Sequence, residues 1–335
     1  MLVLLHADST EEQAAAVEAA IIELGYSPMR VPGRNRTAIC ITGNKTAVDA
    51  GKLRHLPGVV DCVRVTKPYK LVSREIHPED TIVQVGDIQI GGSKPVFIAG
   101  PCSVETEDLA IQVATAVKDA GADLFRAGAY KPRTSPYDFQ GFGREALQTL
   151  AKVRAETGLG IVTEVTETDA VELVAEVADI IQVGTRNMQN FALLKALATT
   201  DRPILLKRGM SASLEEWLMA AEYLIAGGNP NVILCERGIR TFSKHARNTL
   251  DLNVVPLVRT LSHLPIVVDP SHGVGDRARV RPLSRAALAC GAHGLLVEAH
   301  TDPNESFTDA QQTIDMATLK GILTDATLLS KLEPI

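Results

Sequence analysis

The sequence predicts a (β/α)8 TIM barrel preceded by a small ferredoxin-like α+β domain and a β-hairpin. From Pro95 onward, strand-like and helix-like segments alternate eight times. Eight such units in about 235 residues match the usual length of a barrel. The strand segments are apolar and β-branched, as in a parallel sheet that is covered on both faces. A doubly wound open sheet is the alternative, but no G-x-G-x-x-G follows the first strand, so we favour the barrel.

The barrel segments can be read in order along the chain. One helical segment starts with a capping box, Ser213 to Glu216, and ends at Gly227-Gly228. Other helical stretches include EDLAIQVATAVKDAG and LQTLAKVRAETG. The eight expected strands are VFIAGPCS, DLFRAGAY, GIVTEV, DIIQVGT, PILLKRG, VILCERG, PIVVDPSH and HGLLVEAH.

Residues 1–67 form a unit of their own in this interpretation. Strand-like MLVLLHA is followed by helical spacing over residues 11–24, a strand pair, a short helix in TAVDAGKLRHL and a closing strand. The order βαββαβ is the ferredoxin-like pattern. Residues 68–94 are a polar linker and a β-hairpin that turns at Gly86-Asp87. The expected domains are therefore 1–67, 68–94 and 95–335.

Composition excludes several classes of protein. A formal net charge of −6 gives no support for nucleic-acid binding, so an anion site requires a local cluster of Arg and Lys. The longest apolar runs have the length of strands, so we expect no membrane span. No basic segment followed by an apolar one opens the chain, which favours a cytoplasmic protein. The five scattered cysteines indicate reduced thiols.

Charged side chains recur where the expected strands end, which is where barrel enzymes hold their sites. Six of them are cations: Arg126, Lys131, Arg133, Arg186, Lys207 and Arg237. Such a ring suits a small, multiply charged phosphate or carboxylate, because Arg binds both with two parallel hydrogen bonds. Alternatively, each cation pairs with a neighbouring carboxylate on the surface, which is easier to accept for one residue than for six.

A second set of strand-end residues is Cys102, His272 and Glu298, with Asp309 as a fourth member. A thiolate, an imidazole and two carboxylates can hold one divalent transition metal, and Mn²⁺, Fe²⁺, Co²⁺ and Zn²⁺ all suit this mixture. Taken singly, Cys102 could be a small core residue and His272 could only hydrogen-bond its loop.

Six motifs occur together and in order: GPCSVE, KPRTSPYDFQG, QVGTRNMQNF, LKRG, LCERGIRTF and DPSH. They resemble 3-deoxy-D-arabino-heptulosonate-7-phosphate (DAHP) synthases, the first enzymes of the shikimate pathway. The likeness is to the short type I-beta subgroup and covers residues 83–335. Residues 1–67 resemble the ferredoxin-like regulatory domain of some members. The sister 3-deoxy-octulosonate-8-phosphate synthases have a different loop at Lys131–Ser135.

The resemblance implies condensation of phosphoenolpyruvate with erythrose 4-phosphate and water. Phosphoenolpyruvate would be bound by Arg126, Lys131, Arg186, Lys207 and Arg237, and erythrose 4-phosphate by Pro132, Arg133 and Thr134. The metal ligands would be Cys102, His272, Glu298 and Asp309. Lys131 would act as general acid, and Glu164 and Asp269 would position water or neighbouring ligands.

Two alternatives remain: an octulosonate-8-phosphate synthase that uses arabinose 5-phosphate, and a non-catalytic amino-acid sensor. The Lys131–Ser135 loop argues against the first. The presence of every expected cation and ligand argues against the second. The resemblance further implies a homotetramer and feedback by tyrosine or phenylalanine through residues 1–67. A folding or assembly role is the alternative for that unit.

Overall fold

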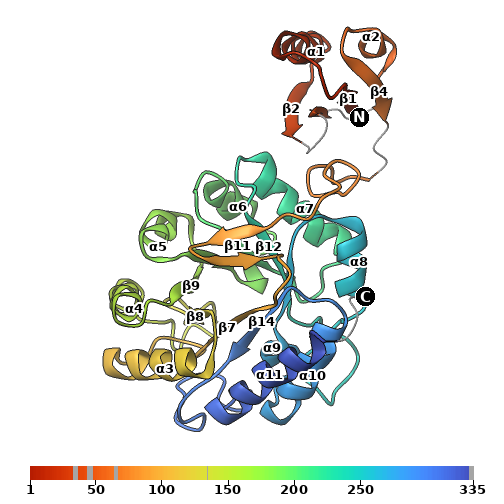
Figure 1. The fold of residues 1–335 in the computed structure, drawn as a ribbon. Coiled ribbons are helices and arrows are strands. Elements are labelled where there is room, and N and C mark those ends of the chain that lie inside the picture. The colour runs from red at the N-terminus through yellow and green to blue at the C-terminus, as the bar shows by residue number, and fades with distance from the viewer. Residues whose placement is uncertain (33–36, 44–47, 64–66, 134, 332–335) are drawn as a thin grey trace. The chain divides into compact units, whose positions relative to one another are not determined.

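The computed structural model describes residues 1–32, 37–43, 48–63, 67–133 and 135–331 (Figure 1). The chain divides into two compact units. The first comprises Met1–Asp80 with Leu261–His263, and the second comprises Thr81–Thr260 with Leu264–Ile335.

The N-terminal domain has the ferredoxin-like order that the sequence predicts. Its elements are β1 (Leu2–Leu5), α1 (Glu11–Glu23), β2 (Ser27–Pro32), β3 (Thr37–Thr42), α2 (Gly51–Arg54) and β4 (Val59–Val63). The strands form a sheet in the order β2-β3-β1-β4. A capping box between Thr10 and Gln13 starts α1, whose Val17 and Ile21 are fully buried with Ile39 in one core. The predicted helix over residues 46–56 is shorter than expected, and part of it lies outside the described residues.

The segment after this domain packs against Leu261–His263 within the first unit. Arg74 N donates to the carbonyl of Leu261 at 3.1 Å, and Ser73 pairs with Ser262 in an isolated antiparallel β-bridge. The ring of His263 lies 4.4 Å from that of His77, and its Nε2 is 2.7 Å from the carbonyl oxygen of Leu71.

Eight parallel strands close the predicted barrel, with β14 paired to β7. Each is a short, largely apolar run buried on both faces, as parallel strands require. The strands are β7 (Val96–Gly100), β8 (Leu124–Arg126), β9 (Gly160–Val165), β10 (Ile180–Val183), β11 (Ile204–Lys207), β12 (Val232–Glu236), β13 (Ile266–Val268) and β14 (Gly294–Glu298).

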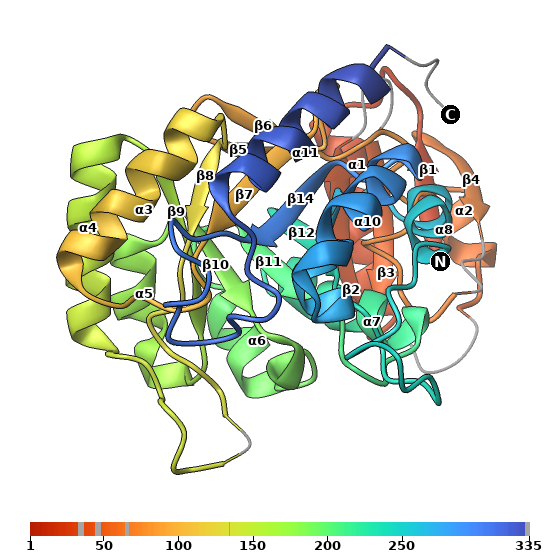
Figure 2. The ribbon, with the colours of Figure 1, turned by 90° about the horizontal axis from the view of Figure 1, so that it is seen from below.

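Helices surround the barrel (Figure 2). They are α3 (Glu107–Ala120), α4 (Arg144–Thr157), α5 (Val171–Val177), α6 (Phe191–Leu197), α7 (Leu214–Ala226), α8 (Val254–Leu261), α9 (Pro270–Val274), α10 (Arg277–Ala289) and α11 (Met316–Leu329), with short 3-10 turns at Thr168–Ala170 and Thr185–Asn187. The predicted capping box of Ser213 and Glu216 starts α7, and Gly227 ends it. No helix in the described part of the chain is long and apolar enough to cross a membrane.

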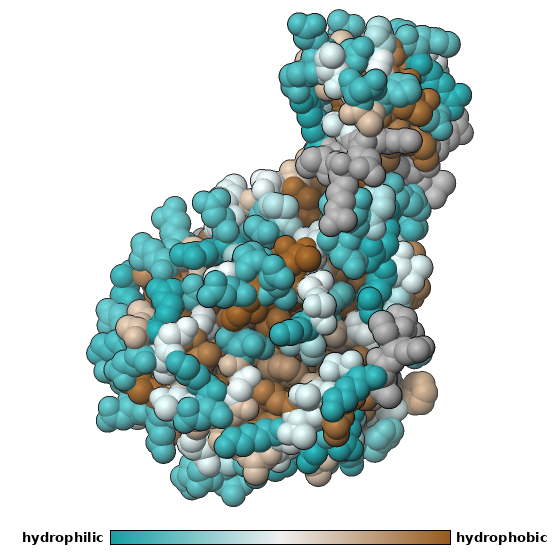
Figure 3. Space-filling view, viewed as in Figure 1, coloured by the Kyte–Doolittle hydropathy of each residue, from teal (hydrophilic) through white to brown (hydrophobic). Residues whose placement is uncertain are grey.

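The hairpin β5 (Val83–Val85) and β6 (Ile88–Ile90) closes one end of the barrel. Val83 and Ile90 pack in one core with Leu124 and Ile180, the first residues of β8 and β10. The hairpin therefore covers the N-terminal ends of the strands and leaves the C-terminal ends for a site. Figure 3 shows the face that the hairpin covers, with apolar residues over its middle and hydrophilic residues around its rim.

All the barrel strands except β9 end two to four residues earlier than the sequence predicts, and β8 and β13 fall short by four. β8 ends at Arg126, and the chain then runs as a loop that is tied to its neighbour by a bridge between Ser103 and Gly128. β13 ends at Val268 because Asp269 caps α9: its side chain accepts from His272 N, and Pro270 takes the first helical position. The capping turn carries His272 to the C-terminal end of the barrel.

Candidate active site

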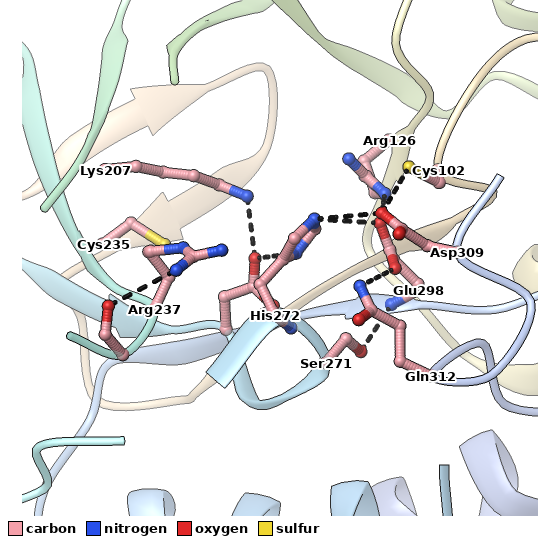
Figure 4. A network of polar contacts seen from close by, with 12 residues as sticks. Cys102, Arg126, Lys207, Cys235, Arg237, Ser271, His272, Glu298, Asp309 and Gln312 are labelled. Atoms are coloured by element: carbon pink, nitrogen blue, oxygen red, sulfur yellow. Dashed lines mark hydrogen bonds and ion pairs between the residues drawn. The ribbon is translucent and has the colours of Figure 1, made fainter. Parts of the chain in front are cut away.

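Four side chains meet at the C-terminal end of the barrel (Figure 4). Cys102 follows β7, His272 lies in α9, Glu298 ends β14, and Asp309 lies in the loop before α11. Their potential ligand atoms all lie within 4.8 Å of one another. His272 Nε2 is 3.2 Å from Glu298 Oε1 and 3.9 Å from Asp309 Oδ2. Cys102 Sγ is 3.4 Å from the same Asp309 oxygen.

The orientation of His272 is set by Asp269. Oδ1 of Asp269 accepts from the backbone of His272 at 2.9 Å, and Oδ2 lies 2.7 Å from Nδ1. The Asp269 carboxylate can only accept a hydrogen bond, so Nδ1 carries the proton and donates, and the lone pair of Nε2 is directed at Glu298. Burial lowers the pKa of His272, so the neutral imidazole that a metal needs is favoured.

Lys207 completes this arrangement on the other side of Asp269. Its Nζ donates to Oδ2 of Asp269 at 2.7 Å, and both side chains are almost fully buried. Although burial opposes ionisation, the contacts with His272 and Lys207 hold the pKa of Asp269 well below its usual value. Asp269 is therefore an anion that contacts both the Lys207 ammonium and the His272 imidazole.

Glu298 is completely buried and held at both oxygens. Arg126 Nη1 donates to Oε1 at 2.9 Å, and Gln312 Nε2 donates to Oε2 at 2.6 Å. Burial opposes its ionisation, yet His272 and Arg126 hold the pKa of Glu298 below its usual value. Glu298 is thus available as a charged ligand.

Cys102 is buried beside Lys131, whose Nζ donates to Sγ at 3.1 Å. Burial, with the nearby charge of Glu298, raises the pKa of the Cys102 thiol to about 11. The thiol therefore keeps its proton at neutral pH until a cation displaces it. Gly100, two residues earlier, is required at its position because a Cβ there would lie 2.1 Å from the carbonyl oxygen of Arg126.

The donor set fits a divalent ion. Sulfur, a ring nitrogen with its lone pair directed inward and two carboxylate oxygens converge in a largely buried place. Such electron-rich atoms repel one another unless a proton or a cation lies between them. Sulfur, nitrogen and oxygen together suit a borderline transition metal better than Ca²⁺ or Mg²⁺, which take oxygen ligands.

The six predicted cations line one cavity of about 170 Å³ beside this group. Arg126, Lys131, Lys207 and Arg237 are at most 9% exposed. Arg126 Nε has no hydrogen-bond partner among the described residues, so a donor remains for a ligand. Pro132 lines the same cavity, and Thr134 lies outside the described residues.

Glu164, at the end of β9, also lines the cavity. Gln182 Nε2 donates to its Oε2 at 2.9 Å, whereas Oε1 is buried without a hydrogen-bond partner in the described part of the chain. A Cβ at Gly184 would lie 1.9 Å from Oε1, so any larger residue there would displace this carboxylate.

Charged residues at other strand ends form ion pairs away from the four assigned metal ligands. Arg208 after β11 pairs with Glu236 at 3.1 Å and with Asp251 at 2.9 Å. His300 lies 3.9 Å from the buried Glu105. The sequence interpretation did not single out several polar residues of the site, namely Gln182, Arg240, Arg247, Asn248 and Gln312. Gln182 and Arg240 belong to quoted motifs, but no spacing pattern marks the others.

A closed barrel whose strand ends gather cations beside a metal-type ligand group defines an enzyme that handles small, multiply charged anions. The profile of the DAHP synthetase I family matches residues 73–332. The DAHP synthase ferredoxin-like domain matches residues 1–67. The chain belongs to the DAHP synthetase I family.

Individual relatives agree with this assignment. Phospho-2-dehydro-3-deoxyheptonate aldolase of Thermotoga maritima is 47% identical over 323 residues, which are 96% of each chain. A 2-dehydro-3-deoxyphosphooctonate aldolase of Magnetococcus marinus is 31% identical over 75% of this chain and 93% of its own. The crystal structure of the Thermotoga maritima DAHP synthase superposes with a TM-score of 0.78 at 46% identity, covering 98% of this chain and 96% of that one.

Proposed function

We propose that this chain condenses phosphoenolpyruvate with erythrose 4-phosphate and water to give 3-deoxy-D-arabino-heptulosonate 7-phosphate and phosphate. The observation that carries the proposal is the ring of cations, four of them buried, beside the Cys102–His272–Glu298–Asp309 group, in a chain of this family. The distribution of identity supports the seven-carbon product, because the heptonate aldolase shares 47% of residues and the octonate aldolase 31%.

Phosphoenolpyruvate is assigned to Arg126, Lys131, Arg186, Lys207 and Arg237. Two polyanions repel each other in a neutral site, whereas a ring of cations neutralises both and orients them for reaction. Because Arg126 and Lys207 already lie against Glu298 and Asp269, they cannot swing freely, and the site is organised before substrate binds.

Erythrose 4-phosphate is assigned to the loop after β8, through Pro132, Arg133 and Thr134. Arg133 Nε donates to the carbonyl of Phe139 at 3.1 Å, which leaves its Nη groups for a phosphate. Pro132 and Pro136 restrict the loop and lower the entropy lost when it orders around an anion.

Carbon 3 of phosphoenolpyruvate would attack the aldehyde, and water would add at carbon 2. The bond between carbon 2 and the phosphate oxygen would then break and release phosphate. A divalent ion held by Cys102, His272, Glu298 and Asp309 would polarise the aldehyde oxygen. Lys131, already an N–H donor at the edge of this group, would give that oxygen its proton. Glu164, with its free Oε1, would orient the water.

The test compares phosphate release from phosphoenolpyruvate with erythrose 4-phosphate and with arabinose 5-phosphate. We expect turnover with the four-carbon sugar and little with the five-carbon sugar. Faster turnover with arabinose 5-phosphate would favour the octulosonate reaction, and no turnover with either would favour a sensor. By family likeness we also expect a cytoplasmic homotetramer, which size-exclusion chromatography with light scattering would test for its subunit number.

A further inference from the structure

Two residues outside the assigned ligand set bind its carboxylates. Gln312 lies three residues after Asp309 and is fully buried. Arg247 lies in the loop between β12 and α8, and its side chain is 40% exposed at the edge of the cavity. The Arg247 backbone donates to the carbonyl of Val274 at 3.1 Å, so this loop is attached to the end of the helix that carries His272.

The contact between the two residues fixes the amide of Gln312. Arg247 Nη1 lies 2.9 Å from Oε1 of Gln312, and a guanidinium can only donate. The amide oxygen must therefore face Arg247, which turns the amide nitrogen toward Glu298, 2.6 Å from its Oε2. Figure 4 shows Gln312 beside Glu298 in this orientation.

The same pair therefore binds one oxygen of each carboxylate. Oε2 of Glu298 accepts from Gln312, and Oδ1 of Asp309 accepts from Arg247 at 3.1 Å. The other oxygens, Oε1 of Glu298 and Oδ2 of Asp309, are the ones that face His272 Nε2. In Glu298 and in Asp309, one carboxylate oxygen is therefore directed away from the four assigned metal ligands and the other is directed toward His272.

We propose that Gln312 and Arg247 are positioning residues that restrict Glu298 and Asp309 to binding a metal ion through one oxygen each. This inference rests on the metal site of the proposed function. A carboxylate can bind through one or two oxygens, and two-oxygen binding raises the coordination number. With each acid limited to one oxygen, the chain supplies four ligand atoms, and positions stay open for substrate or water.

The test is a cobalt titration of the full-length protein after chelator treatment. Thiolate-to-cobalt charge transfer in the near ultraviolet reports ligation by Cys102. The visible d–d bands weaken as the coordination number rises, so they report whether a carboxylate has changed to two-oxygen binding. Neither signal depends on turnover.

The variants are Gln312→Met, which keeps the volume but removes both hydrogen bonds, and Arg247→Met. The neighbouring, exposed Gln311→Met is the matched control. We expect both test variants to bind Co²⁺ about 10- to 100-fold more weakly and with weaker visible bands, whereas the control behaves as wild type. Arg247→Lys retains a positively charged donor nitrogen and should recover part of the affinity.

Thermal unfolding without metal identifies a variant that has merely lost its fold, and the partly exposed Arg247 gives a second route if Gln312→Met does not fold. Dissociation constants and band intensities equal to wild type in both folded variants would overturn the proposal. A wild-type protein with no charge-transfer band would overturn the metal site itself, and the positioning role with it.

Discussion

The carboxylate of Asp269 lies 2.7 Å from Nδ1 of His272 through the same oxygen that binds Nζ of Lys207. The buried carboxylate thus orients His272, an assigned metal ligand, and holds Lys207, which is assigned to phosphoenolpyruvate. A change at Asp269 should therefore affect both metal binding and phosphoenolpyruvate binding.

Asp269→Asn should lower the metal affinity about 10- to 100-fold, because the amide no longer fixes the tautomer of His272. It should also weaken phosphoenolpyruvate binding, since Lys207 loses its charged partner. Isothermal titration with each ligand separately would measure both effects. Asp276→Asn is a matched control, because Asp276 caps α10 in a similar way outside the cavity. Unchanged affinities in Asp269→Asn would contradict the coupling.

Removal of the metal should abolish turnover, and Mn²⁺ or a similar divalent ion should restore it. Cys102→Ala and His272→Ala should be folded and nearly inactive, because each removes one of four assigned ligands. Cys290→Ala is the control, since Cys290 caps the end of α10 and is no part of the cavity. Phosphate release, measured beside metal content, is the readout. Full activity in protein shown to be free of metal would contradict the assignment.

The strands of the barrel were predictable because each is buried on both faces and reads as a short apolar run. Strand ends share one end of a parallel barrel, so Arg126, Lys207 and Glu298 could be grouped from their positions in the sequence alone. The ferredoxin-like order was predictable from alternating periodicity.

The contacts among the loops were not predictable. Arg247 meets Gln312 across 65 positions of the chain, and neither residue lies at a strand end. The early end of β13 depends on whether Asp269 continues a strand or caps a helix, and local pattern did not distinguish these choices. The free oxygen of Glu164 depends on space left by Gly184, a contact between neighbouring strand ends that no local pattern encodes.

Arg133→Ala should raise the KM for erythrose 4-phosphate about ten- to a hundredfold, because a charged contact to phosphate contributes about 1.5–3 kcal/mol. The KM for phosphoenolpyruvate should hardly change, since Arg133 is assigned to one substrate. Steady-state kinetics with each substrate varied in turn would measure this. The exposed Arg144→Ala, at the start of α4, controls for loss of a positive charge. A collapse of phosphoenolpyruvate binding in Arg133→Ala would show that the cations are divided wrongly.

Acidification should destabilise the first unit through His263. Burial lowers the pKa of His263 from 6.5 to about 4, and its Nε2 donates to the Leu71 carbonyl. The folded state therefore binds the proton less readily than the unfolded state. Stability is fully present above pH 6.5 and is lost as the pH falls toward 4. Relative to His263→Gln, the wild type should lose up to about 3 kcal/mol in this interval. Urea unfolding of both proteins across it is the measurement, and parallel curves would contradict the prediction.

Removal of residues 1–67 should leave an active barrel that no longer responds to tyrosine or phenylalanine. Every residue assigned to catalysis lies between Cys102 and Asp309, so the ferredoxin-like domain needs another role. An amino acid bound to that domain can inhibit only if it binds the less active conformation better than the active one.

The measurement is activity of the full-length and truncated proteins at rising concentrations of the three aromatic amino acids. Linkage adds a second readout: an effector that weakens substrate binding must itself bind less tightly when substrate is present, by the same factor. Inhibition that persists after truncation would locate the effector site in the barrel. A full-length enzyme indifferent to all three amino acids would favour the folding or assembly role, which a fall in the unfolding temperature or subunit number of the truncated protein would then reveal.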